Sequence, residues 1–372
     1  MRTSLKLYGD SARARSLIAG MVWMTAAMAV IAGTAMKCHA QSVRTDVLDA
    51  RALPLGDGRV SAEPKRGYVF SCMSRFRGGG AQHAGDWIHG SSWDSTRKVI
   101  VQGDVRWPNA FFKITTVGSE RRVTGNGLPV DHTTGIYPVR RSDPAFAIDR
   151  NPNSIREQQV AFSLPLEPAI AGAPSCVPMG MIGVALNGVA LYNALDDAGR
   201  DAVAHEVQDH CNGHPEMQGR YHYHGPTPCL TGATSRNGLI GYALDGFGIT
   251  SPYDENGREL TNADLDDCHG RVSRIEWNGR QVSMYHYVLT REYPYTVGCF
   301  RGRAVRVQAR GGKGPPNRGG PRGMRRPPPE AIDACIGLAS GSLCRFTSPR
   351  GDQISGSCRS LPGATACVPE RR

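Results

Sequence analysis

The sequence predicts a mainly β fold: a β-sandwich or barrel-like domain that contains an internal tandem repeat, one or two short helices and several disulfides. Three observations support this class: short β-branched and aromatic runs, two Asn-Gly or Asp-Gly hairpin signals, and 11 cysteines. Hydrophobic residues make up 40% of the 372, which is enough for a core and excludes wholesale disorder. Only one apolar run is long enough to span a bilayer, which excludes a polytopic membrane protein.

Residues 1–40 have the features of a secretory signal peptide. Basic residues precede an apolar run from Leu17 to Met36, and the small residues Cys38 and Ala40 flank the end of the segment. A retained anchor is the alternative, because the run is long for a signal core. Cleavage would remove Cys38, and the even number of cysteines left in an exported chain favours disulfides over free thiols. We therefore expect a periplasmic or secreted protein with no transmembrane domain after cleavage.

Composition divides the rest of the chain into four segments. Residues 41–67 lack periodicity and form a loose lead-in, and residues 68–302 hold most of the apolar pattern as one large domain. Residues 303–329 contain eight Arg or Lys and no acidic residue, and residues 330–372 hold four cysteines in a near-symmetric spacing. The basic segment predicts a solvated linker, with weak binding to an anionic envelope surface as the alternative. We expect no nucleic-acid partner, because an exported protein seldom meets nucleic acid.

Within the large domain, local patterns predict strands and one helix. The segments Lys98–Val105, Phe111–Val123 and Gln159–Leu166 are β-branched and aromatic or alternate in polarity, which predicts strands. One helix is expected near Ala194–Val207, where apolar residues recur at helical spacing.

An internal repeat relates residues 180–229 to residues 238–299. The blocks GMIGVALNGVALY and GLIGYALDGFGIT share six of thirteen positions, and each places Asn-Gly or Asp-Gly between apolar runs. That dipeptide predicts a hairpin, because a type I′ turn requires positive φ at both central residues. Each copy continues with an Asp-x-Cys-x-Gly sequence, a Tyr-His-Tyr sequence and a closing cysteine. We therefore expect a tandem duplication packed as two equivalent halves.

The repeat also orders the cysteines of the large domain. Corresponding positions predict the bridges Cys211–Cys229 and Cys268–Cys299, which leave Cys72 and Cys176 to pair with each other. The four cysteines of the tail are expected to pair among themselves, in one of three ways.

Histidines cluster in the first half, where the sequence Tyr-His-Tyr-His occupies residues 221–224. Strand alternation sends His222 and His224 to one face, where they can hold an ion that takes nitrogen ligands, such as zinc or copper. The natural third ligand is His286, the equivalent residue of the second half, in which Val288 replaces the second histidine. Candidates for a fourth ligand, or for groups that orient an imidazole, are Asp209, His210, His214, Asp266 and His269.

Three other interpretations stay open. The histidines can be hydrogen-bonded groups of a packed interior. The domain can be a non-enzymatic binding module, with Trp87, Trp93 and Trp107 stacking on a sugar or peptide, or a disulfide-stapled structural protein without a site.

A zincin helix is disfavoured, because the residue four positions after His205 is Asp209 rather than a histidine. No Gly-rich phosphate loop or Ser-His-Asp order stands out, so no nucleotide cofactor is expected.

Four sequence blocks resemble the YHYH-domain proteins of bacterial secreted and periplasmic fractions: GHPEMQGRYHYHGPTPC, IGYALDGFGI, DLDDCHGR and MYHY followed by YPYTVGC. The resemblance covers roughly residues 68–302 and implies an exported domain, with no activity that can be transferred. Val288 departs from a full second motif. The tail is similar to small four-cysteine modules that end other exported bacterial proteins.

Overall fold

The computed structural model describes residues 48–76, 78–230, 232–233, 235–307, 327–336, 338–347, 353–361 and 364–369. The predicted signal peptide, residues 1–40, lies outside the described residues, as do residues 308–326 of the predicted linker. The main body, residues 48–307, and the tail, residues 327–369, each consist mainly of strands and loops, so the mainly β class is confirmed.

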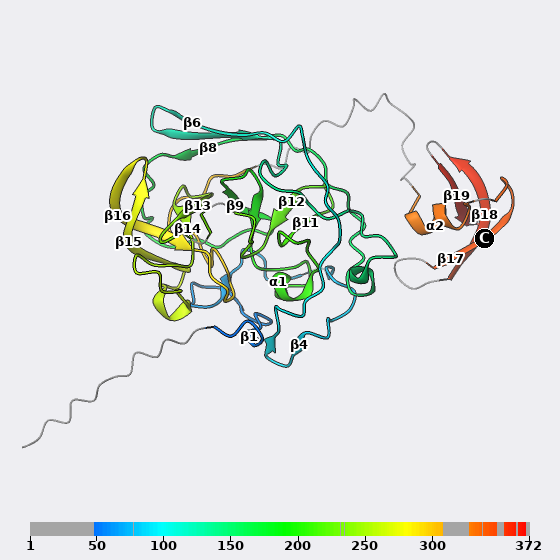
Figure 1. Cartoon of the computed structure of the whole chain (residues 1–372), viewed down its shortest axis with the longest axis horizontal. Helices are drawn as coiled ribbons and strands as arrows, with labels where there is room; N and C mark the ends of the chain where they lie inside the picture. The colour runs from blue at the N-terminus through cyan, green and yellow to red at the C-terminus, as the bar shows by residue number, and fades with distance from the viewer. Residues whose placement is uncertain are drawn as a thin grey trace, which may run out of the picture. The chain divides into compact units, whose positions relative to one another are not determined.

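The centre of the main body is an eight-stranded sheet (Figure 1). Its strand order is β11-β12-β10-β9-β13-β14-β16-β15. The pair β15 and β16, yellow in Figure 1, forms one end of the sheet, and the green pair β11 and β12 forms the other. The strands are β9 (Met181–Ala185), β10 (Ala190–Tyr192), β11 (Gly213–Pro215), β12 (Tyr221–Tyr223), β13 (Leu239–Ala243), β14 (Gly248–Thr250), β15 (Gly270–Trp277) and β16 (Arg280–Val288).

The strand order of this sheet has the same pattern from both edges. β9 and β10 form one hairpin and β13 and β14 the other, with Gly188 (φ 87°) and Gly246 (φ 91°) at the two predicted turns. A parallel strand follows each hairpin, β12 beside β10 and β16 beside β14. An antiparallel strand, β11 or β15, completes each half, and the halves meet where β9 pairs with β13. The sequence duplication that would explain this arrangement stays a prediction.

The described part of the main body also contains three smaller sheets. Two of the three predicted strand segments form the sheet β6 (Phe112–Val117), β7 (Glu120–Gly125) and β8 (Val160–Pro165). The third, Lys98–Val105, forms only single bridges at Val101 and Val105. Short strands complete the set: β1 (Leu53–Pro54) with β5 (Ser92–Trp93) and β4 (Ile88–His89), and β2 (Val60–Ser61) with β3 (Val69–Phe70).

Helices in the main body are short. They are the 3₁₀ helices η1 (Pro144–Ala147) and η2 (Asn262–Asp264) and the α-helix α1 (Ala202–His205). The helix predicted near Ala194–Val207 is therefore much shorter than expected. Asp196 closes a turn by accepting the backbone N–H groups of Ala198 and Arg200, and Asp201 caps α1 by accepting from Ala204. The turn at Asp196 keeps the residues before Asp201 out of the helix, and the N-cap at Asp201 sets the helix start at Ala202, which explains the later start.

Two tryptophans that could have formed a sugar-binding surface lie in the core instead. Trp87 and Trp93 are 1% and 3% exposed and belong to a hydrophobic cluster beside α1. Trp107 is half-buried and donates its Nε1–H to Thr134. The alternative in which Trp87 and Trp93 stack on a ligand is therefore wrong, because a buried ring presents no face to a solute.

Disulfides join all ten cysteines of the described residues. Cys72–Cys176, Cys211–Cys229 and Cys268–Cys299 confirm the three pairs predicted for the main body. The tail contains Cys335–Cys358 and Cys344–Cys367, one of the three pairings left open.

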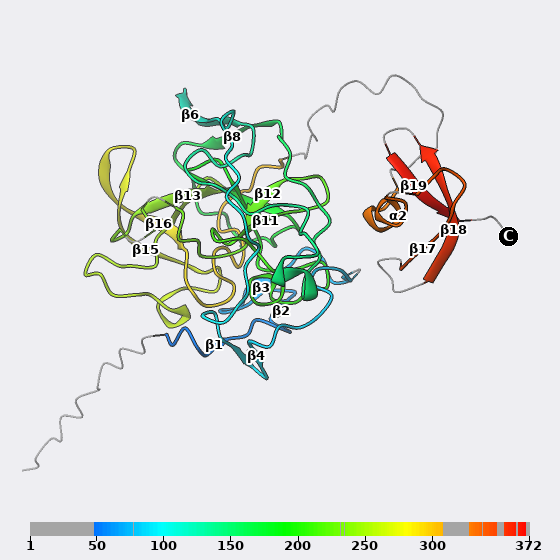
Figure 2. The ribbon, with the colours of Figure 1, turned by 45° about the vertical axis from the view of Figure 1, so that its right-hand side comes forward.

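The tail is a small sheet with one helix (Figure 2). Helix α2 (Pro329–Asp333) packs with the antiparallel strands β17 (Leu343–Thr347), β18 (Gln353–Leu361) and β19 (Ala364–Pro369). None of the helices in the described part of the chain is long and apolar enough to cross a membrane.

We expect the mature protein to contain no free thiol when it is purified from an oxidising compartment. Every described cysteine is paired, and Cys38, the one outside the described residues, belongs to the predicted signal peptide. Alkylation of the denatured, unreduced protein should add no label in mass spectrometry, whereas prior reduction should expose every cysteine of the mature chain. A labelled Cys211 or Cys268 would contradict the pairing within the two halves.

Candidate metal centre

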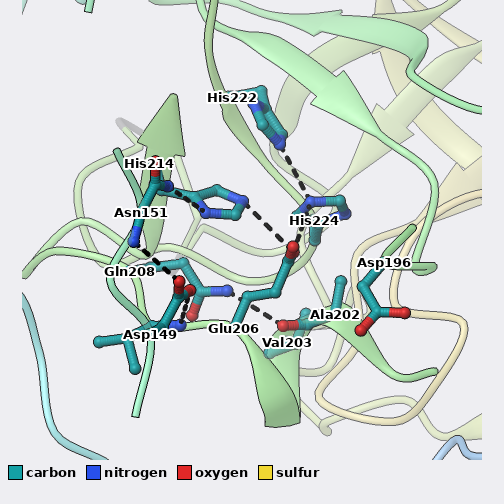
Figure 3. Close-up of polar contacts among 12 residues, drawn as sticks. Asp149, Asn151, Asp196, Ala202, Val203, Glu206, Gln208, His214, His222 and His224 are labelled. Atoms are coloured by element: carbon teal, nitrogen blue, oxygen red, sulfur yellow. Dashed lines mark hydrogen bonds and ion pairs between the residues drawn. The ribbon is translucent and has the colours of Figure 1, made fainter. Parts of the chain in front are cut away.

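Three buried histidines converge where β11 lies against β12 (Figure 3). His214 of β11 stands directly opposite His222 of β12, and His224 follows two residues later on the same face. The three side chains are 4%, 2% and 4% exposed, and one nitrogen from each lies within 4.8 Å of the others. The predicted grouping of His222 with His224 is therefore present, and His214 is the third member.

The tautomers of His222 and His224 follow from their backbone partners. Nδ1 of His222 lies 3.0 Å from the carbonyl oxygen of Arg220, and Nδ1 of His224 lies 2.5 Å from that of Asn193. A carbonyl oxygen only accepts, so each Nδ1 carries the proton and each neutral ring keeps a lone pair on Nε2.

Those two lone pairs point at each other, because the Nε2 atoms of His222 and His224 are 3.0 Å apart. Burial lowers the pKa of His222 well below its usual range and that of His224 to about 4, which disfavours an imidazolium that could donate between them. The contact is favourable only when a cation or a shared proton lies between the two nitrogens.

Glu206 supplies a carboxylate to the same cluster. It ends α1, and its Oε2 lies 3.5 Å from Nε2 of His214 and 3.4 Å from Nε2 of His224 (Figure 3). Neither contact is a hydrogen bond, and both Oε2 of Glu206 and Nε2 of His214 are buried without a hydrogen-bond partner. Burial, with the nearby charges of Asp149 and Asp196, raises the pKa of Glu206 well above its usual range. A divalent cation would reverse that effect.

The distances fit a tetrahedral ion. Metal–ligand bonds of about 2.0–2.1 Å place the ligand atoms of a tetrahedron about 3.3 Å apart. The separations of 3.0 Å between His222 and His224, and of 3.4 and 3.5 Å from Glu206 to His224 and His214, lie close to that value.

His214 is less prepared for coordination than the other two histidines. The amide nitrogen of Asn151 lies 3.4 Å from its Nδ1 and donates a shorter bond, 3.1 Å, to the carbonyl of Pro215. A proton on Nδ1, which coordination through Nε2 requires, would face this N–H donor, so Asn151 must shift when His214 binds an ion.

Other groups of possible ligands in the described residues do not qualify. They are His132 with Cys211 and Cys229, Asp209 with His210 and Cys211, and a set of three tail cysteines. Each contains cysteines that are held in disulfides and therefore offer no thiolate. The histidine cluster is the candidate that remains among the described residues.

The predicted participation of His286 is wrong. It lies on β16, and four strands lie between β12 and β16, so five inter-strand spacings of about 4.8 Å place the two strands roughly 24 Å apart. Its Nε2 lies 2.8 Å from Ser273 Oγ and its Nδ1 lies 3.0 Å from Thr250 Oγ1. The halves meet through β9 and β13, so the equivalent histidine strands lie away from the junction on opposite sides.

The remaining predicted residues have structural contacts. Asp209 accepts from Tyr221, and Asp266 accepts from Tyr285 at the equivalent place. His210 is exposed and its Nε2 approaches the hydroxyl of Thr133, and His269 contacts Thr290. None of these four residues reaches the histidine cluster, whereas the fifth candidate, His214, is part of it.

Sequence reasoning missed Glu206. Glu206 follows His205 in the sequence, but neither helical nor strand periodicity predicts that its carboxylate lies next to the clustered histidines. Its position depends on where the short helix α1 ends relative to β11 and β12, which is a tertiary relationship.

A large cleft gives access to the cluster. Its volume is about 1090 Å³, and Glu206, His214, His222 and His224 are among its lining residues. Tyr192 also lines it and stacks on the ring of His222, with ring centroids 3.8 Å apart. The site is therefore buried by its neighbours yet open on one side to a solute.

Comparison with known families gives one match. Residues 161–261 match the family model described as YHYH protein. The resemblance found in the sequence is thus confirmed for this part of the chain. The matched range contains Glu206 and the three clustered histidines, whereas His286 lies beyond it. No curated protein and no solved structure matches the chain.

Asp209 should prove essential to the fold rather than to ion binding. Its buried carboxylate accepts the Tyr221 hydroxyl and the N–H groups of Gly135, Cys211 and Gly213. We expect Asp209→Ala to lower the free energy of unfolding by about 2–4 kcal/mol, because it leaves buried donors unpaired.

Chemical denaturation measures this difference. The control is Asp267→Ala, because Asp267 is exposed and accepts one backbone N–H, so its loss should cost about 0.5 kcal/mol or less. Equal stability of the two variants would show that the hydrogen bonds of Asp209 do not stabilise β12.

Proposed function

We propose that this protein is an exported metal-binding protein that holds one divalent ion, zinc or copper, through His222, His224, His214 and Glu206. The observation that carries the proposal is the 3.0 Å contact between two Nε2 lone pairs. A packed interior without an ion would orient at least one of these nitrogens toward a donor.

The ligand types favour a borderline cation. Imidazole nitrogens with one carboxylate suit zinc and copper, whereas magnesium and calcium prefer oxygen ligands. The carbonyl groups of Arg220 and Asn193 fix the rings of His222 and His224 by accepting from Nδ1, which is the usual way in which a protein orients metal-binding imidazoles.

Export is supported by the cysteines and by the sequence of residues 1–40. Five disulfides are typical of an oxidising compartment, and the apolar run from Leu17 to Met36 with its basic flank is typical of a secretory signal. Binding of the basic segment 303–329 to an anionic envelope surface remains a secondary proposal, supported by its composition alone.

The cleft makes a reactive role chemically reasonable. A bound zinc ion would act as a Lewis acid, and a copper ion as a redox centre, toward a molecule in the cleft. The chain's own contribution is to fix the histidines, to exclude water from their buried side and to keep the cleft side accessible.

We expect His222→Ala and His224→Ala each to lower metal affinity by at least about tenfold, since each removes a pre-oriented ligand. His214→Ala should lower the affinity less, because Asn151 opposes its coordinating tautomer. The measurement is elemental analysis of protein without a histidine tag, purified from the periplasm, followed by competition titration with zinc and copper.

The second half of the sheet supplies the controls. His286→Ala removes the equivalent histidine and should leave the bound metal unchanged. His224→Val introduces the residue that the second half carries at that position, and it should lower metal affinity as much as His224→Ala does, with little change in side-chain volume. If wild type holds no metal, or if His222→Ala and His286→Ala lose it equally, the proposed centre is wrong.

A further inference from the structure

Arg220 is a buried cation beside the histidine cluster, and it has no anionic partner among the described residues. It immediately precedes β12, so alternation places it on the same face as His222 and His224. The residue is 8% exposed and lines the cleft, and its Nε has no hydrogen-bond partner. No carboxylate of the described residues lies within 4.0 Å of its guanidinium group.

The acid that lies across the β11–β12 turn from Arg220 is already engaged. Glu216 stands across from Arg220, and its carboxylate accepts the backbone N–H of Gln218 at 2.7 Å and that of Arg220 at 3.3 Å. These bonds close the turn between β11 and β12. The guanidinium therefore lines the cleft without an acid to neutralise it, and its Nε has no hydrogen-bond partner.

Tyr192 adds a second donor at the same place. Its ring stacks on His222, and its phenol lies in reach of Arg220. Tyr192 also lines the cleft, where its phenol can donate a hydrogen bond.

We propose that Arg220 and Tyr192 bind the anionic group, a carboxylate or a phosphate, of a small molecule that enters the cleft. A buried guanidinium without a counter-ion is costly, and its planar fork matches both oxyanions. The idea that a bound metal ion acts on this molecule rests on the proposed function. The anion subsite itself consists of protein groups alone and requires no metal.

The test titrates metal-free protein, prepared with a chelator, with inorganic phosphate and with acetate, and follows binding by calorimetry. Arg220→Gln should weaken the preferred anion by at least about tenfold, because it removes charge-assisted hydrogen bonds. The matched control is Arg303→Gln, which removes an exposed arginine from the same cleft and should change affinity by less than about twofold. Comparison of the two anions distinguishes a phosphate from a carboxylate ligand.

Tyr192→Phe keeps the ring stacked on His222 and removes only the phenol, so it tests the subsite even where Arg220→Gln fails to fold. It should weaken anion binding by about threefold or more. Absence of binding to wild type, or equal binding by wild type, Arg220→Gln and Tyr192→Phe, would overturn the proposal. Anion binding by a wild type that contains no metal as purified and takes up neither zinc nor copper on titration would support the subsite while refuting the metal centre.

Discussion

The close pairing of β9 with β13 is the constraint on which the rest of the main body depends. Gly183 stands opposite Ala243 and Gly241 opposite Ala185. A Cβ at Gly183 would lie 2.7 Å from the carbonyl oxygen of Tyr242, and one at Gly241 would lie 2.5 Å from that of Val184. Only glycine permits this approach. From that junction each hairpin extends outward and adds one parallel strand with the sequence Tyr-His-Tyr, so the junction sets the position of both histidine strands.

The same frame carries the candidate centre in one half only. The first half places Glu206, His214, His222 and His224 together. The corresponding residues of the second half, in the same order, are Ala263, Arg271, His286 and Val288. A lone histidine in such a frame forms hydrogen bonds with hydroxyl groups, as His286 does with Ser273 and Thr250. Whether a histidine on this strand can act as a metal ligand therefore depends on the side chains packed around it, and the sequence of the strand alone does not determine this.

Local features of the fold could be predicted from the sequence, and distant relationships could not. The Asn-Gly and Asp-Gly turns, the shared face of His222 and His224 and three disulfides depend on short-range geometry or on matching of the two halves. The error about His286 came from assuming that equivalent strands meet, whereas strand order separates them. The burial of Trp87 and the approach of Glu206 likewise depend on packing between segments far apart in the chain.

Along β12 the tyrosines anchor the strand on one face, and the histidines form the candidate metal centre on the other. On the side of the hydrophobic core, Tyr221 donates to Asp209 and Tyr223 accepts from Asn187. In the second half, Tyr285 donates to Asp266 and Tyr287 donates to Asp245. The tyrosines thus have the same anchoring role in both halves, including the half without a histidine cluster. Because the anchored tyrosines leave the opposite face of β12 free to line the cleft, the first half can hold buried histidines there without losing the contacts that fix the strand. The Tyr-His-Tyr strand is therefore a support, and the residues packed against it decide whether its histidine can bind an ion.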